Sequence, residues 1–253
     1  TRLTPSLAVN SFSVGSRVYL VMDFVPGKDL RTLMVEARQA GNFLAEADVL
    51  SWASQLCDAI SYLHQQDPPI LHRDIKPSNL KVTPSGLLKL VDFGLVKLMA
   101  PGEVTITILQ GQGTALYTPL EQYGGDSGHT DVRSDIFAFG STLYHLLTNQ
   151  SPPDARERFL NPSVLVPPRQ INPSINARTE RGILWAMALH PDERPESITQ
   201  FRAGLLGDYN PISRPLPVTN GSPPAYWKAQ PEQALLWVSA GLAVTGFLFT
   251  LIR

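Results

Sequence analysis

The chain has 253 residues, with 21 Lys and Arg against 22 Asp and Glu, 43% hydrophobic residues and a single cysteine. Its near-zero net charge and lack of a long basic run argue against binding nucleic acid by phosphate neutralisation, so we expect no nucleic-acid partner. One cysteine, Cys57, excludes an intramolecular disulfide framework and a cysteine-rich zinc site.

The first elements show the hydrophobic patterns of a folded domain that extends over residues 1–206. The apolar run at 18–25 (VYLVMDFV), which ends at a Pro-Gly pair, predicts a buried strand. Residues 45–66 place apolar side chains at helical spacing and predict a helix. Cys57 lies within that helix, so we expect a packed and unreactive thiol.

A short hairpin follows. Residues 80–82 (LKV) and 87–91 (LLKLV) predict two strands, and the TPSG sequence between them suits a type I turn. Because a hairpin returns the chain antiparallel, Asn79 and Asp92 are expected to meet at its open end. A carboxamide oxygen and a carboxylate in that position can bind a hard divalent cation together with phosphate oxygens.

The segment HRDIKPSN at 72–79 adds further polar groups just before the hairpin. In an extended loop, Asp74 and Lys76 point the same way. The carboxylate can orient a hydroxyl group and accept its proton, and the ammonium can neutralise phosphate charge in a transition state. Together with a metal ion, these are the parts that phosphoryl transfer requires.

Three helices are predicted in the second half of the domain. Residues 134–149 form an almost wholly apolar pattern, which predicts a central helix capped by Ser134 or Asp135. Residues 178–190 and 197–206 predict two more helices. The domain is therefore expected to be mainly helical after residue 45.

The C-terminal region differs in character. Residues 207–232 carry six prolines and predict an extended linker, with a tail packed on the domain as the alternative. Residues 233–252 contain no charge and are long enough to cross about 30 Å of hydrocarbon as a helix. Because this apolar segment follows a linker, we predict a transmembrane helix rather than a buried core helix.

The motifs together resemble those of protein kinases. HRDIKPSN is similar to the catalytic loop of that family, and Asp92-Phe93-Gly94 is similar to its metal-binding motif. The sequences at 113–122 (GTALYTPLEQ), 134–140 (SDIFAFG) and 190–195 (HPDERP) also resemble later family motifs. The lysine in the loop is typical of serine/threonine kinases, and the style of the motifs is most similar to bacterial members. The resemblance covers residues 1 to about 206.

The resemblance implies an α+β fold, with a mainly helical large lobe and only the last part of the small β lobe. It implies that Asp74 orients the substrate hydroxyl and accepts its proton, while Lys76 contacts the transferring phosphate. Asn79 and Asp92 would hold Mg²⁺, with Mn²⁺ as a second candidate ion.

The resemblance also implies an ATP site. The carbonyl of Asp23 and the amide of Val25 would meet the adenine edge, with Met22 at the back of the pocket. Asp29 stands where the family often has a ribose-contacting acid. Lys81 departs from the apolar residue that commonly covers the adenine, although its aliphatic stem can serve instead.

Other residues resemble regulatory and structural positions of the family. Arg73 would steady the activation segment, and Thr114 would contact the catalytic aspartate. Thr105 and Thr107 are either phosphorylation sites in that segment or ordinary β-branched loop residues.

Three structural residues complete the resemblance. Glu121 would form an ion pair with Arg194, and Asp135 is the acid that matches the family's central helix. Leu120 precedes Glu121 where the family usually has proline.

One departure leaves two interpretations open. No Gly-rich phosphate loop precedes the hinge, and no lysine occurs before Lys28. Either the sequence is a fragment that lacks about 60 residues of an ordinary domain, or it is a truncated and inactive descendant. The intact catalytic motifs favour the fragment.

We therefore expect an ATP-dependent serine/threonine kinase that acts on protein substrates. The membrane helix at 233–252 would anchor it with the kinase domain in the cytoplasm, and a homodimer could phosphorylate itself in trans. The alternative is a catalytically inactive kinase-like scaffold that signals by binding a partner.

Overall fold

The computed structural model describes residues 10–14, 17–21, 23–92, 97–98, 115–123 and 130–207. The chain divides into two units, Thr1–Arg214 and Pro215–Arg253, and every described residue lies in the first. The predicted membrane helix at 233–252 and nearly all of the predicted linker at 207–232 therefore lie outside the described residues. Among the helices that are described, none has the length and apolar character needed to cross a membrane.

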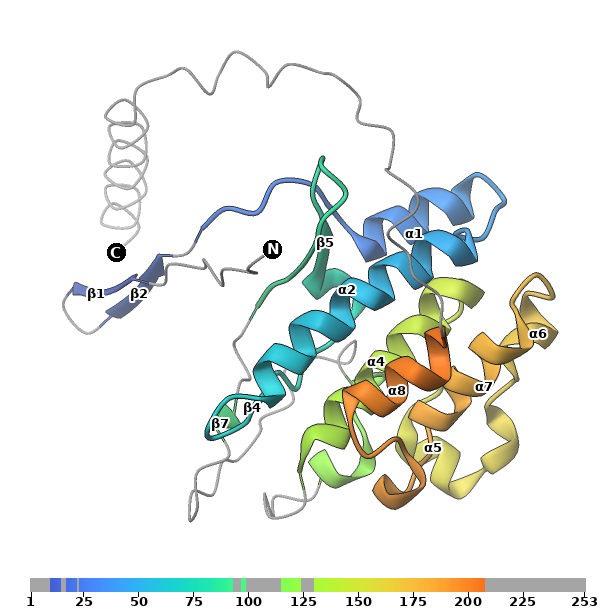
Figure 1. The fold of residues 1–253 in the computed structure, drawn as a ribbon. Coiled ribbons are helices and arrows are strands. Elements are labelled where there is room, and N and C mark those ends of the chain that lie inside the picture. Colours follow the sequence, from blue (N-terminus) through green and yellow to red (C-terminus); the bar gives the residue numbers. More distant parts are fainter. Residues whose placement is uncertain are drawn as a thin grey trace, which may run out of the picture. The chain divides into compact units, whose positions relative to one another are not determined.

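Helices form most of the described structure (Figure 1). The two longest are α2 (Glu46–His64) and α4 (Val132–Thr148), and they pack against each other. The other helices are α1 (Leu30–Gln39), α5 (Ala155–Leu160), α6 (Pro168–Ile171), α7 (Ala177–Ala186) and α8 (Ile198–Leu206). Short 3₁₀ turns are η1 (Pro77–Asn79), η2 (Leu120–Gln122), η4 (Pro162–Val164) and η5 (Pro191–Glu193).

The strands are short and form three small antiparallel sheets. Strand β1 (Asn10–Val14) pairs with β2 (Arg17–Val21) in a two-stranded ribbon, and β4 (Ile70–Leu71) pairs with β7 (Lys97–Leu98). The third sheet has the order β3 (Lys28–Asp29), β5 (Leu80–Val82) and β6 (Leu88–Leu90). The predicted α+β class and the hairpin are thus confirmed, with the second strand two residues shorter than expected.

The prediction of a buried strand at 18–25 was only half right. A strand is present as β2, but its described side chains Tyr19 and Val21 are exposed, as is Phe24 beyond it. Within the described part of the chain, β2 pairs only with β1, and a two-stranded ribbon has no second layer to cover its faces. The apolar sequence of β2 predicts a buried strand, but no described segment covers its side chains Tyr19 and Val21.

Helix α4 is buried on nearly every side, and apolar side chains occupy most of its circumference. Phe139 of α4 packs edge-to-face against Phe201 of α8, with ring centroids 5.2 Å apart. Gly140 allows α7 to approach closely, since a Cβ atom there would lie 2.7 Å from the Cβ of Ala186. The helix cap is Asp131, whose carboxylate accepts from the Arg133 amide, and not Ser134 or Asp135 as predicted.

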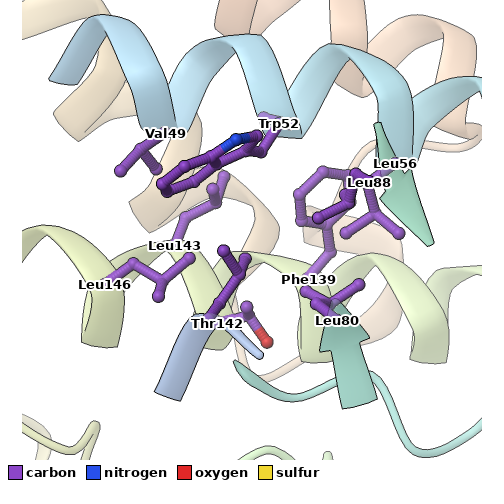
Figure 2. A pocket seen from close by; sticks show the side chains of 11 residues that line it. Val49, Trp52, Leu56, Leu80, Leu88, Phe139, Thr142, Leu143 and Leu146 are labelled. Carbon is purple, nitrogen blue, oxygen red and sulfur yellow. The ribbon is translucent and has the colours of Figure 1, made fainter. Parts of the chain in front are cut away.

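An apolar layer connects the hairpin to the two long helices. Figure 2 shows Trp52 of α2 above Leu143 of α4, with Leu80 and Leu88 of the hairpin beside Phe139. The residual cavity in this layer measures about 10 Å³, which is at the lower limit for a single water molecule. Since its walls are apolar, the layer is dry and holds the hairpin firmly against α2 and α4.

The other predicted helices are present, and three more accompany them. The helices predicted at 45–66, 178–190 and 197–206 appear as α2, α7 and α8. Helices α1, α5 and α6 were not predicted individually. Cys57 is buried in α2, and burial raises the pKa of its thiol to about 12, so the predicted unreactive thiol fits its environment.

The packing of Phe139 leads to a stability prediction. We expect Phe139→Ala to lower the free energy of unfolding by about 3–5 kcal/mol, because it removes a fully buried ring and leaves a cavity. Urea denaturation followed by circular dichroism measures the change. The exposed Leu160→Ala is the control, with an expected loss below about 0.5 kcal/mol. Equal losses in the two variants would contradict the assigned core.

Candidate active site

The loop that follows β4 is fixed by one buried carboxylate from α4. The amide of His72 donates to Oδ2 of Asp135 at 2.9 Å, and the amide of Arg73 donates to Oδ1 at 2.8 Å. Arg73 has φ of +66°, a conformation that costs a non-glycine residue about 1–3 kcal/mol. The two charge-assisted hydrogen bonds offset this cost and hold the loop in its strained form.

Two histidines surround the same carboxylate. Nε2 of His64, at the end of α2, lies 2.9 Å from Oδ2 of Asp135. Burial alone would raise the pKa of Asp135, but the hydrogen bond and charge of His64, the charge of His72 and the Arg73 amide lower it. Burial lowers the pKa of His72, against the opposing charges of Asp135, Asp74 and Asp92. Asp135 is therefore an anion in the core, stabilised by groups of the loop and of α2.

Asp74 is the centre of a compact polar cluster. Its Oδ2 accepts from Nζ of Lys76 at 2.7 Å and from Nδ2 of Asn79 at 2.8 Å. The Asn79 amide nitrogen also donates to the backbone carbonyl of Asp74 at 2.9 Å. The other oxygen, Oδ1 of Asp74, is buried and has no hydrogen-bond partner among the described residues. This oxygen can therefore accept a hydrogen bond from a substrate hydroxyl group, as a carboxylate that takes up the hydroxyl proton must do.

The cation ligands expected from the sequence lie at the open end of the hairpin. Both hydrogens of the Asn79 amide nitrogen point to Asp74, so its side-chain oxygen remains as an acceptor, and among the described residues its hydrogen-bond contact is the Ser78 hydroxyl at 3.4 Å. The register pairs Asn79 with Val91, whose amide donates to the Asn79 carbonyl at 2.9 Å. Asp92, the next residue, is exposed and has φ of +66°. This donor set of one carboxamide and one carboxylate fits Mg²⁺ or Mn²⁺ with phosphate oxygens.

Two side chains that were expected to contact the nucleotide, Lys81 and Asp29, form hydrogen bonds within the protein. Nζ of Lys81 donates to the Val25 carbonyl at 2.9 Å and lies 5.5 Å from the ring centroid of Phe24. Asp29 caps α1, because its carboxylate accepts from the amide of Thr32 at 2.8 Å and from its hydroxyl at 3.2 Å. Both side chains thus have structural partners that the sequence analysis did not foresee.

The other two predicted nucleotide residues, Met22 and Asp23, are consecutive and precede Phe24 and Val25 in the sequence. Asp23 is exposed, and Met22 lies outside the described residues. The regulatory candidates Thr105, Thr107 and Thr114 also lie outside, as do Phe93 and Gly94 of the predicted metal-binding motif.

The ion pair predicted between Glu121 and Arg194 is present and buried. Nη1 and Nη2 of Arg194 donate to the two Glu121 oxygens at 2.6 and 3.0 Å, in the bidentate geometry that guanidinium favours. The hydroxyl of Ser134 adds a third bond to Glu121 at 2.8 Å. These contacts attach the segment at 115–123 to α4 and to the loop between α7 and α8.

Sequence reasoning missed a row of polar groups on α4. Besides Asp135, Thr142 donates to the Ile75 carbonyl at 3.2 Å, and His145 Nδ1 lies 2.6 Å from the Tyr117 hydroxyl. Asn149, which ends the helix, donates to the Asn42 carbonyl at 3.0 Å. The available signal was their spacing of seven, three and four residues, which places polar side chains on one face of an otherwise apolar helix.

Comparison with known proteins defines the class. A family profile described as the protein kinase domain matches residues 8–186, so the chain belongs to the protein kinase family. The serine/threonine-protein kinase PknB of Mycobacterium leprae is 30% identical over 210 residues, covering 77% of this chain and 31% of that protein. A probable serine/threonine-protein kinase of Streptomyces coelicolor is 33% identical over 199 residues, covering 74% of this chain and 28% of that protein.

A solved structure shows the same fold. The structure titled "PpkA-294 apo form" superposes with a TM-score of 0.59 at 22% identity, covering 78% of this chain and 67% of that one. The chain spans about three tenths of the length of the bacterial kinases it matches.

The pair of Tyr117 and His145 leads to a prediction about pH. Burial lowers the pKa of His145 to about 4, and the charges of Arg31 and Arg38 act in the same direction. An unfolded histidine titrates near pH 6.5, so the unfolded state binds more protons between about pH 6.5 and 4. The contribution of neutral His145 to stability is therefore complete above this range and is lost as the pH falls through it.

We expect the wild-type protein to lose on the order of 2 kcal/mol more stability than His145→Gln between pH 7 and 4.5, after allowance for partial exposure. Glutamine keeps an acceptor for Tyr117 but does not titrate. Urea denaturation at both pH values measures the difference, with the exposed His190→Gln as control. If all three proteins lose the same stability, His145 is not the titrating group.

Proposed function

We propose that the protein is an ATP-dependent serine/threonine kinase that transfers the γ-phosphate of ATP to hydroxyl groups of protein substrates. The observation that carries the proposal is the cluster in which Lys76 and Asn79 both donate to Oδ2 of Asp74. This arrangement leaves Oδ1 of Asp74 without a partner among the described residues. Membership of the protein kinase family and the names of the bacterial relatives support the same activity.

The geometry supports a separate proposed task for each side chain. Asp74 orients the substrate hydroxyl and takes its proton on Oδ1, since Oδ2 is already occupied. Lys76, held 2.7 Å from that carboxylate, brings a positive charge to the phosphate that is transferred. Asn79 and Asp92 would hold Mg²⁺ or Mn²⁺, which neutralises phosphate charge when it is bound.

Lys81 and the hinge would bind the purine of ATP. With its ammonium on the Val25 carbonyl, Lys81 fixes the hinge backbone and leaves its aliphatic stem to cover the base. The backbone carbonyl of Asp23 and the amide of Val25 are the proposed adenine contacts, with Met22 behind them and Asp29 near the ribose.

An inactive scaffold is the second candidate function. Two observations favour it: the Asp29 carboxylate caps α1, and the Lys81 ammonium engages a hinge carbonyl. If these groups exclude the nucleotide, the folded domain would signal by binding alone. The catalytic variants described below separate the two functions.

The placement of Arg73, whose backbone amide donates to Asp135, supports a proposal about regulation. Burial lowers the pKa of the Arg73 guanidinium, and the charge of Asp135 opposes this shift. We propose that Arg73 steadies the activation segment, that Thr114 contacts Asp74, and that phosphate on Thr105 or Thr107 orders the segment. Phosphorylation in trans within a homodimer is the proposed source of that phosphate.

We expect Asp74→Asn to lower kcat at least about 10²-fold, because the amide cannot accept the hydroxyl proton. Asp92→Asn should abolish transfer at ordinary Mg²⁺ concentrations, because a cation ligand loses its charge. Transfer of labelled γ-phosphate from ATP by the full-length protein, to itself or to a protein substrate, measures both effects.

The exposed Asp48→Asn on α2 is the matched control and should retain wild-type activity. Thermal denaturation shows whether each variant is folded. Unchanged activity in Asp92→Asn would contradict the metal role, and a wild-type protein without transferase activity would favour the scaffold.

Residues 233–252 are proposed to anchor the protein in the membrane, with the linker at 207–232 and the kinase domain on the cytoplasmic side. The support is the twenty-residue stretch without a charged side chain, which matches the thickness of the hydrocarbon layer. Deletion of residues 233–253 should move the protein from the membrane fraction to the supernatant after ultracentrifugation. A deleted form that still sediments with membranes would show that another segment is the anchor.

A further inference from the structure

A lysine of β5 reaches back to the hinge, residues 23–25. Nζ of Lys81 donates to the Val25 carbonyl at 2.9 Å and lies 5.5 Å from the ring centroid of Phe24. Lys81 itself is half-buried. Its ammonium forms no ion pair with the described residues, so the Val25 carbonyl is the polar partner that the structure gives to this cation.

The strand register explains why the ammonium turns to the hinge. Lys81 lies opposite Asp29 of β3 and opposite Lys89 of β6, and directly opposed residues of antiparallel strands share one face of a sheet. The Asp29 carboxylate is held by the amide and hydroxyl of Thr32 at the start of α1. Lys89 is a second cation, and like charges in opposed positions repel. The hinge carbonyl is therefore the acceptor that remains for Lys81.

The hinge also offers the two groups that a purine edge requires. Among the described residues, neither the Asp23 carbonyl nor the Val25 amide has a hydrogen-bond partner. One is an acceptor and the other a donor, so they fit the 6-amino group and N1 of adenine, as in the proposed function. An extended backbone turns the N–H and C=O of one residue to the same side. The Val25 carbonyl is therefore the next hinge group along the edge of a base bound there.

The edge of a purine carries its groups in a fixed order. In adenine the 6-amino group is followed by N1 and then by carbon 2, which bears only a hydrogen atom. With the first two groups on Asp23 and Val25, carbon 2 faces the Val25 carbonyl, which already accepts from Lys81. Guanine and 2,6-diaminopurine carry an amino group, a hydrogen-bond donor, at carbon 2.

We propose that Lys81 makes the nucleotide site selective for purines without an amino group at carbon 2. The inference rests on the proposed kinase function and adds the class of nucleotide to it. A carbonyl oxygen has two lone pairs, but a 2-amino group would share this one with an ammonium whose charge repels its hydrogens. Adenine has no donor at that position and loses nothing. Lys81 thus favours ATP by rejecting its 2-amino relatives.

The test compares ATP with the triphosphate of 2,6-diaminopurine riboside, which differs from ATP by the amino group at carbon 2 alone. Displacement of a ribose-labelled fluorescent ATP analogue from the full-length protein measures both Kd values without any phosphate transfer. We expect the wild-type protein to bind ATP at least about fivefold more tightly. In Lys81→Leu and Lys81→Met the carbonyl can serve the base, so the 2-amino nucleotide should bind at least as tightly as ATP.

The matched control is Lys89→Leu, which removes a cation from the same face of the sheet and should keep the wild-type ratio of Kd values. Lys81→Arg retains a cationic donor at the hinge carbonyl and should keep the preference for ATP. Thermal denaturation shows whether each variant is folded. Equal binding of the two nucleotides by the wild-type protein, or an unchanged ratio in Lys81→Leu, would overturn the proposal.

Transfer assays separate this proposal from the kinase function. Selective binding without phosphate transfer would refute the kinase activity and leave the role of Lys81 standing. Transfer with equal KM values for the two nucleotides would support the kinase and overturn the selectivity. For a direct contact with the base, the ratio of the two KM values should change in Lys81→Leu while kcat for ATP stays constant. If neither nucleotide binds, both proposals fail.

Discussion

The hydrogen bonds of the buried Asp135 carboxylate are the interaction on which the candidate site depends. This carboxylate receives the amides of His72 and Arg73 and contacts the ring of His64. Without it, two loop amides would lose a buried acceptor, and the strained backbone of Arg73 would lose one of the hydrogen bonds that hold it. Because these hydrogen bonds fix the backbone of His72 and Arg73, they also fix the position of the Asp74 carboxylate that follows.

The same helix organises segments that are far apart in the sequence. Along one face of α4, Asp135 binds the start of the catalytic loop, Thr142 binds its middle, and His145 meets Tyr117 of the 115–123 segment. Asn149 then reaches the connection between α1 and α2. Because α4 is buried on nearly every side, its position is fixed by the core, and each of these segments takes its position from one rigid element.

Prediction from sequence succeeded where the signal is local and strong. The long helix at 45–66 and the hairpin at 80–91 follow from hydrophobic spacing and turn residues, and the pairing of Glu121 with Arg194 follows from family motifs. Helix α1 was not predicted, because the Asp29 carboxylate suits both a ribose contact and a helix N-cap, and the sequence alone does not distinguish the two roles. The exposure of β2 was missed because an apolar pattern indicates what a strand could bury, and not whether a second layer covers it.

The sequence by itself determined the chemistry that is available: an acid, an ammonium and an amide in one short loop, with a second acid after a tight hairpin. Only the tertiary structure decided how they share their hydrogen bonds, with one oxygen of Asp74 saturated by Lys76 and Asn79 and the other left over. It also decided that the neutral pair of Tyr117 and His145 lies within the field of two arginines from α1. Hydrogen-bond sharing and electrostatic fields depend on distances between elements, which spacing along a chain does not encode.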